Sequence, residues 1–433
     1  MANPLAIESP QRPLLERFPG LKRLPFVPLM DGIPTPVQRL ERLSAEYPGF
    51  DVWIKRDDIC SSIYGGNKPR KFEFLLADAL AKKKNKIITA GGTGTNHGLA
   101  TVLFAKALGL KSKIYMFDQP LTWGVQKKLL MYLGLDTEIE LVHGYGHLLF
   151  KGLYNAMFHP RTFMMLPGGS PLFGIGSVLG CIGFVNAGFE LKEQIDAGAM
   201  PEPDYIYIAA GSTGSSSGLI LGCHLAGLKT KVVAVQVSDG TITNPASIER
   251  NIKKTSSVLH KLDPAIPVAS LVHDRDFLFV SGYLGSKYAC VTKSGLQAVD
   301  KVAEFEGDLG FHLETTYTGK ACAAMLDFMA DPEHKGPATI LFWNTYNSKD
   351  LTELAKGFEY QKLPRALRKY FDTRLTCWQN KSCPDEVREV CPAYFNDDNR
   401  CWNVMAKAGE DTSECDACPA KKAIEENSPI ENA

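Results

Sequence analysis

The sequence predicts an α/β protein with parallel sheets in two domains, and three observations carry this prediction. Short apolar runs alternate with amphipathic stretches of helix length over most of the chain. Loops rich in glycine and hydroxyl side chains follow several of these runs and precede the next helix. The chain has 433 residues, 45% of them hydrophobic, which is enough for two buried cores. Strands that alternate with helices indicate parallel sheets covered on both faces.

The predicted elements follow one another in a regular order. Strands are expected at 86–92, 111–117, 137–142, 162–169, 205–210 and 231–237. The apolar runs at 86–92 and 231–237 indicate buried strands. Helices are expected between them, at 96–110, 123–135, 147–158, 176–195 and 218–225. In folds of this kind ligands bind at the carboxyl ends of the strands, beside helix N-termini. Functional residues are therefore expected in the loops at those ends.

Composition excludes several classes of partner. The chain carries 48 basic and 48 acidic residues, so its net charge gives no reason to expect nucleic acid or an anionic membrane as a partner. No run approaches the roughly 18 to 20 apolar residues that a membrane helix needs. Residues 1–20 hold prolines and charges where a signal peptide would hold an apolar stretch. We therefore expect a cytoplasmic protein that binds neither nucleic acid nor membrane.

The loop Gly211–Gly218, "GSTGSSSG", has the properties of a phosphate cradle. It follows the apolar run "YIYIAA" and precedes a helix. Its glycines let backbone amides face one point, its hydroxyls add donors, and the helix N-terminus adds partial positive charge. It is neither a Walker loop nor a GxGxxG dinucleotide fingerprint. The alternative is a plain strand-to-helix turn.

A second loop, Gly91–Gly98, lies in the same context and carries Thr95, Asn96 and His97 at the expected helix start. Its amides and hydroxyl can hold a substrate carboxylate, and the alternative is that Thr95 or Asn96 is only an N-cap. A lysine, Lys68, follows two glycines and an asparagine in "GGNKPRK". Two anion-binding loops and one such lysine indicate pyridoxal phosphate, which needs a lysine, a phosphate cradle and a partner for its ring nitrogen.

These motifs together resemble the 1-aminocyclopropane-1-carboxylate (ACC) deaminase/D-cysteine desulfhydrase family. The segments that carry the resemblance are "LPFVPLMDGIPTPVQRLERL", "IKRDD", "GGNKPRKFEFLLADAL", "ITAGGTGTNH", "LPGGS", "GSTGSSSGL" and "TTYTGKA". The resemblance covers roughly residues 20 to 360. It implies a pyridoxal-phosphate enzyme of the tryptophan synthase β-like fold, fold type II, with two open twisted parallel-sheet domains. We expect a large cofactor-binding domain from 1–71 and 181–365, and a small domain from 72–180.

The resemblance also implies roles for individual residues. Lys68 falls on the Schiff-base lysine, Lys71 lies near the phosphate, and Asn96 lies next to the 3-hydroxyl of the cofactor. Thr318 falls on the position that faces the pyridine nitrogen. The implied phosphate loop contains Gly211, Ser212, Thr213, Gly214 and Ser215. The implied catalytic residues are Lys68, Thr95, Tyr288 and Tyr317. The implied substrate-binding residues are Thr95, Asn96, His97 and Thr345.

Two positions favour the desulfhydrase branch of the family, in which a small amino acid such as D-cysteine loses its thiol by β-elimination. Thr318 and Thr345 match desulfhydrases, whereas deaminases carry glutamate and leucine there. Two departures stand against a simple match: Thr95 replaces the usual serine, and Tyr346-Asn347 replaces a glycine pair. The alternatives are an ACC deaminase, another amino-acid ammonia-lyase of this fold, or a non-catalytic ligand- or redox-sensing protein. We further expect a homodimer.

The C-terminal segment 366–433 is expected to be a separate cysteine-rich module. It resembles the small cysteine–tryptophan ("CW") modules appended to various bacterial proteins, and it looks like a duplication. Each half, of about 20 residues, is too short to bury its own core. In a reducing cytosol a metal staple is favoured over disulfides, and thiolate ligands suit zinc or an iron–sulfur cluster. The alternative is a disulfide-stapled tail. The expected ligands are Cys377, Cys383, Cys391, Cys401, Cys415 and Cys418.

Overall fold

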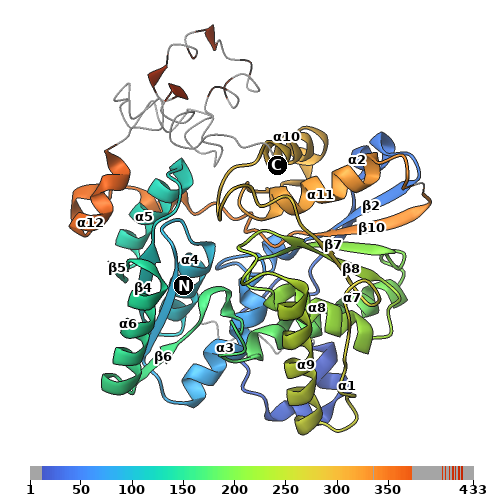
Figure 1. Cartoon of the computed structure of the whole chain (residues 1–433), viewed down its shortest axis with the longest axis horizontal. Helices are drawn as coiled ribbons and strands as arrows, with labels where there is room; N and C mark the ends of the chain where they lie inside the picture. Colours follow the sequence, from blue (N-terminus) through green and yellow to red (C-terminus); the bar gives the residue numbers. More distant parts are fainter. Residues whose placement is uncertain are drawn as a thin grey trace.

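The computed structural model describes residues 12–334 and 336–372, and in the C-terminal segment residues 402, 405, 409, 412, 413, 415, 418, 419, 421 and 422. Two sheets organise the described chain, one of six strands and one of four (Figure 1). None of the described helices is both long enough and apolar enough to cross a membrane.

The larger sheet has the strand order β1-β2-β10-β7-β8-β9. Its neighbours pair in parallel, except for the short edge strand β1, which runs antiparallel to β2. In the register of the sheet centre, Leu341 lies beside Trp53 on one side and Ile206 on the other. The strands are β1 (Val37–Arg39), β2 (Phe50–Lys55), β7 (Tyr205–Ala210), β8 (Lys231–Gln236), β9 (Leu278–Val280) and β10 (Ala338–Trp343).

The smaller sheet is parallel throughout, in the order β5-β4-β3-β6. All four strands lie inside the segment 72–180 that the sequence predicts as the small domain, and the domain boundaries themselves stay a prediction. The strands are β3 (Lys86–Gly92), β4 (Lys111–Phe117), β5 (Glu138–Leu141) and β6 (Thr162–Met164).

Helices cover both faces of the larger sheet. Figure 1 shows α2, α10 and α11 on one side and α7, α8 and α9 on the other. The helices are α1 (Pro13–Arg17), α2 (Glu41–Glu46), α3 (Lys68–Ala81), α4 (Asn96–Ala107), α5 (Trp123–Gly134), α6 (Gly144–Phe158), α7 (Leu179–Asp196), α8 (Gly214–Leu225), α9 (Pro245–Leu262), α10 (Lys293–Glu306), α11 (Thr318–Ala330) and α12 (Arg365–Arg368). Short 3-10 helices are η2 (Pro19–Arg23), η3 (Asp57–Ile59), η4 (Pro167–Gly169), η5 (Gly307–Leu309), η6 (Thr352–Ala355), η7 (Tyr360–Lys362) and η8 (Lys369–Phe371).

The central strands of the larger sheet explain why the apolar runs show no alternation. Ile206 and Ile208 of β7 belong to the core beneath α7 and α8, whereas Tyr207 and Ala209 belong to the core beneath α10 and α11. Successive side chains of a strand point to opposite faces, so a strand covered on both faces needs apolar residues at every position. This arrangement confirms the predicted α/β class with parallel sheets.

Candidate active site

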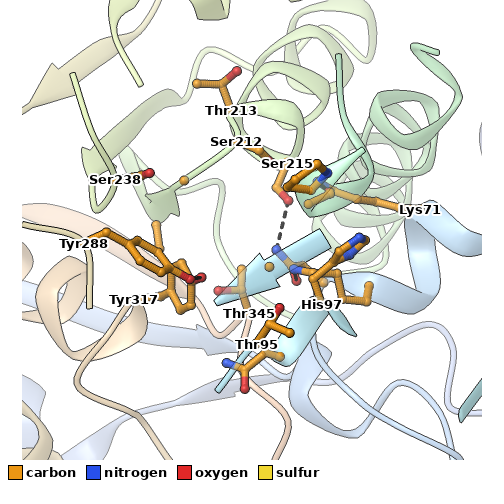
Figure 2. Close-up of a pocket in the computed structure, with 18 of the residues that line it drawn as sticks. Lys71, Thr95, His97, Ser212, Thr213, Ser215, Ser238, Tyr288, Tyr317 and Thr345 are labelled. Carbon is orange, nitrogen blue, oxygen red and sulfur yellow. Dashed lines mark hydrogen bonds between the residues drawn. The ribbon is translucent and has the colours of Figure 1, made fainter. Parts of the chain in front are cut away.

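The carboxyl ends of both sheets border a single cavity of about 190 Å³. Residues from α3, the two glycine loops and the start of α11 line it, and Figure 2 shows their side chains converging from different elements. The cavity brings together every predicted catalytic, cofactor and substrate residue except Gly214: Lys68, Lys71, Thr95, Asn96, His97, Gly211, Ser212, Thr213, Ser215, Tyr288, Tyr317, Thr318 and Thr345.

The two glycines before Lys68 are required by close backbone approaches. A Cβ atom on Gly65 would lie 1.8 Å from the carbonyl oxygen of Asp58. Gly66 has φ +83°, and a Cβ there would lie 2.5 Å from the carbonyl oxygen of Thr345. Only glycine fits such positions, and they bring Lys68 to the first residue of α3.

Lys68 is held in a setting that favours its neutral amine. Its Nζ donates to Asn67 Oδ1 at 2.6 Å, and Asn67 Nδ2 donates to Ser215 Oγ at 3.1 Å. Burial, with a smaller contribution from the charge of Lys71, lowers the pKa of Lys68 to about 7. Glu314 acts in the opposite direction and raises the pKa of Lys68. A lysine with a pKa near neutrality can serve both as a nucleophile and as a base.

Arg70, in the same turn of α3, has a structural role. It is completely buried and pairs with Asp57 at 2.7 Å and with Glu190 at 2.8 Å. Lys55 adds a second pair to Glu190 at 2.7 Å, and Trp343 Nε1 donates to Asp57 at 2.7 Å. Arg70 and Lys55 together lower the pKa of Glu190 far below its usual range. This buried network fixes the start of α3, which presents Lys68 and Lys71 one turn apart.

Lys71 faces the phosphate loop. Its Nζ donates to the carbonyl of Gly168 at 2.8 Å and to Ser170 Oγ at 3.0 Å. Burial lowers the pKa of Lys71 to about 8. Gly214 leaves room for this arrangement, because a Cβ atom there would lie 1.9 Å from Ser170 Oγ and 3.2 Å from Lys71 Nζ. Ser170 belongs to the quoted motif "LPGGS", but no role could be given to it from sequence.

The loop at the start of α4 presents a polar edge to the same cavity. Thr95 is the N-cap, and its Oγ1 accepts a hydrogen bond from the amide of Gly98 at 3.1 Å. Asn96 Oδ1 accepts from Lys128 Nζ at 2.6 Å. This bond fixes the amide, so the NH₂ group of Asn96 is the end left for other acceptors. Lys128 lies on α5, and no local pattern connects it with Asn96.

His97 is neutral, and its tautomer is defined by its neighbours. Thr89 Oγ1 donates to the carbonyl of Met165 at 2.8 Å and lies 2.9 Å from His97 Nε2. Because the single hydroxyl proton goes to Met165, Nε2 must carry the imidazole proton. Burial and the charges of Lys68 and Lys71 lower the pKa of His97 well below its usual value. A charged catalytic role for His97 is therefore disfavoured.

Two tyrosines form the wall opposite Lys71 (Figure 2). The hydroxyls of Tyr288 and Tyr317 share a hydrogen bond, and their rings pack edge to face with centroids 6.0 Å apart. Burial raises the pKa of Tyr317 well above its usual value, and the neighbouring Tyr288 hydroxyl raises it further. Tyr317 thus stays protonated and can act as a hydrogen-bond donor. Phe117 at the end of β4 contacts Tyr288 across the cavity, with ring centroids 6.5 Å apart.

Glu314 is a cavity residue that sequence reasoning missed. Its carboxylate accepts hydrogen bonds from the amides of Thr316, Tyr317 and Thr318 at 2.7 to 3.0 Å. Glu314 lies four residues before the first residue of α11 and is not its N-cap, which is Tyr317, so no capping motif marks it in the sequence. The Thr318 hydroxyl accepts from the Glu314 amide at 2.9 Å. Thr318 therefore presents a neutral hydroxyl to the cavity, and this hydroxyl is hydrogen-bonded to the backbone of Glu314.

Two further residues occupy the place of the expected glycine pair. Tyr346 and Asn347 both line the cavity. Asn347 Oδ1 accepts from the amide of Gly65 at 2.7 Å, so its side chain supports the loop before Lys68. The departure from glycine at 347 is thus compensated by a hydrogen bond to the lysine loop.

The residues present fit pyridoxal phosphate. Lys71 and the N-terminus of α8 form an anion cradle, and the missing side chain of Gly214 lets Ser170 and Lys71 lie close to it. Lys68 lies in the same cavity with a pKa near 7. The donors and the lysine are thus those that this cofactor needs.

The metal prediction for the C-terminal segment is not supported by the described residues. Within them no group of three or more His, Cys, Asp or Glu side chains could hold a metal ion. Cys377, Cys383, Cys391 and Cys401 lie outside the described residues. Cys415 and Cys418 are described and half-buried, and the amide of Cys418 donates to the carbonyl of Cys415 at 3.1 Å.

Comparisons with known proteins agree with this geometry. Residues 29–345 match the family model described as pyridoxal-phosphate dependent enzyme. The D-cysteine desulfhydrase of Serratia proteamaculans (strain 568) is 30% identical over 343 residues, covering 75% of this chain and 95% of the relative. The D-cysteine desulfhydrase of Klebsiella pneumoniae (strain 342) is 29% identical over 353 residues, covering 76% and 94%.

A crystal structure of an ACC deaminase homologue superposes with a TM-score of 0.62 at 26% identity, covering 82% of this chain and 98% of that chain. These matches confirm the predicted family, its fold and a pyridoxal-phosphate-dependent lyase, and leave the cysteine-rich module outside the confirmed part. With the site geometry and a family model spanning most of its length in agreement, this chain belongs to the pyridoxal-phosphate dependent enzymes.

Proposed function

We propose that this enzyme catalyses β-elimination on D-cysteine, converting D-cysteine and one water molecule into pyruvate, hydrogen sulfide and ammonia. The observation that carries the choice of leaving group is Thr318. Its neutral hydroxyl is bonded to the backbone of Glu314. The family resemblance implies that Thr318 faces the pyridine nitrogen, where a carboxylate would strengthen the electron sink. Thiolate is a good leaving group and needs less help than the carbon expelled when a cyclopropane opens. The relatives named as D-cysteine desulfhydrases support the same choice.

Three parts of the chain are proposed to hold the cofactor. Lys71 and the amides at the start of α8 bind its phosphate. The NH₂ group of Asn96, oriented by Lys128, donates to its 3-oxygen. Lys68 carries it covalently, and Asn67 keeps the Lys68 side chain on the side of the phosphate loop.

Lys68 is also proposed to move the proton that starts the reaction. With its amine free and neutral, Lys68 Nζ would accept the proton from the substrate α-carbon. When bound, pyridoxal phosphate supplies the conjugated ring that accepts the electron pair left on that carbon. The pKa of about 7 keeps a large fraction of the Lys68 amine in the neutral, proton-accepting form at neutral pH.

The substrate is proposed to lie between α4 and the tyrosine pair. The N-terminus of α4, with Thr95 and Asn96, binds the substrate carboxylate, and Thr345 lines the same cavity. Tyr317 stays protonated and donates a hydrogen bond to the β-substituent as charge develops on it. His97 contributes through its backbone amide, because its ring is bonded to Thr89.

Steady-state assays with three substrates test this proposal. Purified enzyme is given D-cysteine, L-cysteine and ACC, and sulfide, pyruvate and 2-oxobutyrate are measured. We expect sulfide and pyruvate in equal amounts from D-cysteine, at a rate well above 2-oxobutyrate formation from ACC. Comparable or faster 2-oxobutyrate formation would assign the enzyme to the deaminase branch.

We also propose three general properties of the protein. The large domain comprises 1–71 and 181–365, and the small domain comprises 72–180. The protein is a homodimer and is cytoplasmic. Sedimentation of the full chain measures the oligomeric state, and a monomeric mass would overturn the dimer. Metal analysis of anaerobically purified protein tests whether the cysteines of 366–433 hold zinc or an iron–sulfur cluster. Tail cysteines that resist alkylation until reduced would indicate disulfides instead.

A further inference from the structure

Thr213, in the phosphate loop, has a backbone conformation that its side chain disfavours. Its φ is 60° and its ψ is −11°, in the left-handed region. Of the described non-glycine residues with positive φ, it is the only one with a β-branched side chain. Glycine adopts this conformation without steric cost, whereas a β-branched residue does so only when its surroundings hold it there.

The interaction that holds it comes from α9. Asn251 Nδ2 donates to Thr213 Oγ1 at 2.9 Å, and each of these residues is only 3% exposed. In Figure 2 the Thr213 side chain points away from Lys71 and His97. The hydroxyl therefore serves the contact with α9, and Asn251 itself does not line the cavity.

The conformation matters because of the amides it aligns. A left-handed residue followed by a right-handed one makes successive N–H groups converge into an anion-binding nest. Thr213 is left-handed, and Gly214 begins the right-handed helix α8. The backbone N–H groups of Thr213, Gly214 and Ser215 donate to no other residue that the structure describes. They are thus left for an anion in the cavity.

We propose that Asn251 is a positioning residue for the cofactor phosphate. Its side chain holds Thr213 in the left-handed conformation, and so keeps the three amides converged on the phosphate without touching it. This inference rests on the proposed cofactor site. It explains a buried polar contact between α8 and α9 that the reaction itself does not use, and no local sequence signal marks Asn251.

Binding titrations of cofactor-free protein test the inference, with pyridoxal phosphate and pyridoxal as the two probes. Asn251→Ala should weaken binding of pyridoxal phosphate about tenfold, which is about 1.4 kcal/mol. Binding of pyridoxal, which has no phosphate, should change less than about twofold. Thr213→Gly should weaken binding of pyridoxal phosphate less than Asn251→Ala does, because glycine adopts the left-handed conformation without an anchor. Thr213→Val keeps the branched side chain but loses the hydroxyl, so it should be as weak as Asn251→Ala.

The double variant Thr213→Gly/Asn251→Ala tests whether glycine at position 213 restores the cofactor affinity that Asn251→Ala loses. We expect its affinity for pyridoxal phosphate to lie within about twofold of that of the Thr213→Gly single variant, because glycine no longer needs Asn251. Thr255→Val removes another buried hydroxyl bond of α9, to the carbonyl of Asn251, and controls for general damage to that helix. Melting temperatures of the cofactor-free variants show whether each one folds, and Thr213→Val carries the test if Asn251→Ala does not.

The outcomes separate this inference from the proposed function. If wild type binds no pyridoxal phosphate, the proposed function and this inference both fail. If wild type binds it and Asn251→Ala binds equally well, only the inference fails. A double variant as weak as Asn251→Ala would also overturn it, because Asn251 would then act through something other than the conformation of Thr213.

Discussion

Replacement of Gly214 by alanine should separate cofactor binding from folding. The new Cβ would lie 1.9 Å from Ser170 Oγ and 3.2 Å from Lys71 Nζ, so Ser170 has to move. Ser170 then loses its bonds to Lys71 at 3.0 Å and to Ser212 at 3.2 Å. Two such bonds contribute about 2 kcal/mol together. Gly214 is the first residue of α8, so the helix-interior advantage of alanine does not offset this loss. The cofactor-free protein should therefore lose about 2 kcal/mol of stability.

Cofactor affinity should fall at the same time. The displaced Lys71 ammonium forfeits a charge-assisted bond to the phosphate, which contributes about 1.5–3 kcal/mol. This corresponds to a dissociation constant raised about 10- to 150-fold. Gly211→Ala is the matched control in the same loop, because its Cβ would meet Tyr317 at an ordinary 3.5 Å.

Absorbance titration with pyridoxal phosphate measures the dissociation constants of the cofactor-free Gly214→Ala and Gly211→Ala proteins. Urea unfolding measures their stability. A Gly214→Ala protein that binds as tightly as wild type would refute the cradle. Equal weakening by Gly211→Ala would show that the loop is merely sensitive to any added methyl group.

Four further predictions concern the surroundings of the cradle. Arg70→Ala leaves the buried Asp57 carboxylate without an ion pair and Glu190 with Lys55 alone, so urea unfolding should show a loss of about 3–5 kcal/mol, and a loss below about 1 kcal/mol would contradict the network. In cofactor-free protein, attachment of pyridoxal phosphate should accelerate as pH rises through about 7, where the Lys68 amine loses its proton. Glu314→Gln removes a charge that raises this pKa, so the midpoint should fall, and a midpoint that rises would contradict the assignment. Thr318→Glu should shift the product ratio from sulfide towards 2-oxobutyrate, and an unchanged ratio would show that position 318 does not select the leaving group.

Most strands and helices of the fold could be predicted from local sequence patterns. The strands predicted at 86–92 and 111–117 are observed with the same bounds, because continuous apolar runs and flanking glycines are local signals. The helix predicted at 96–110 ends earlier, at Ala107, since Leu108 and Gly109 close the helix with turn bonds. The antiparallel edge strand β1 has only three residues, and its pairing depends on a partner far along the chain.

Site residues that lie in local motifs could be predicted from the sequence. Site residues that act through contacts with distant parts of the chain could not. "GGNK" and the glycine loops mark Lys68 and its cradle directly. Lys128 reaches Asn96 from another helix, and Asn251 reaches Thr213 from 38 positions away, so neither has a local signature. For His97, only the packed structure shows that Thr89 fixes its tautomer.

Borohydride reduction of the holoenzyme followed by peptide mapping tests the central claim most directly. The reductant fixes the cofactor to whichever lysine carries it, and mass spectrometry identifies that lysine. We expect the label on Lys68, in the peptide that contains "GGNK", with Lys71 unmodified. A label on Lys71, or no labelled lysine in a protein that retains the cofactor, would contradict the account.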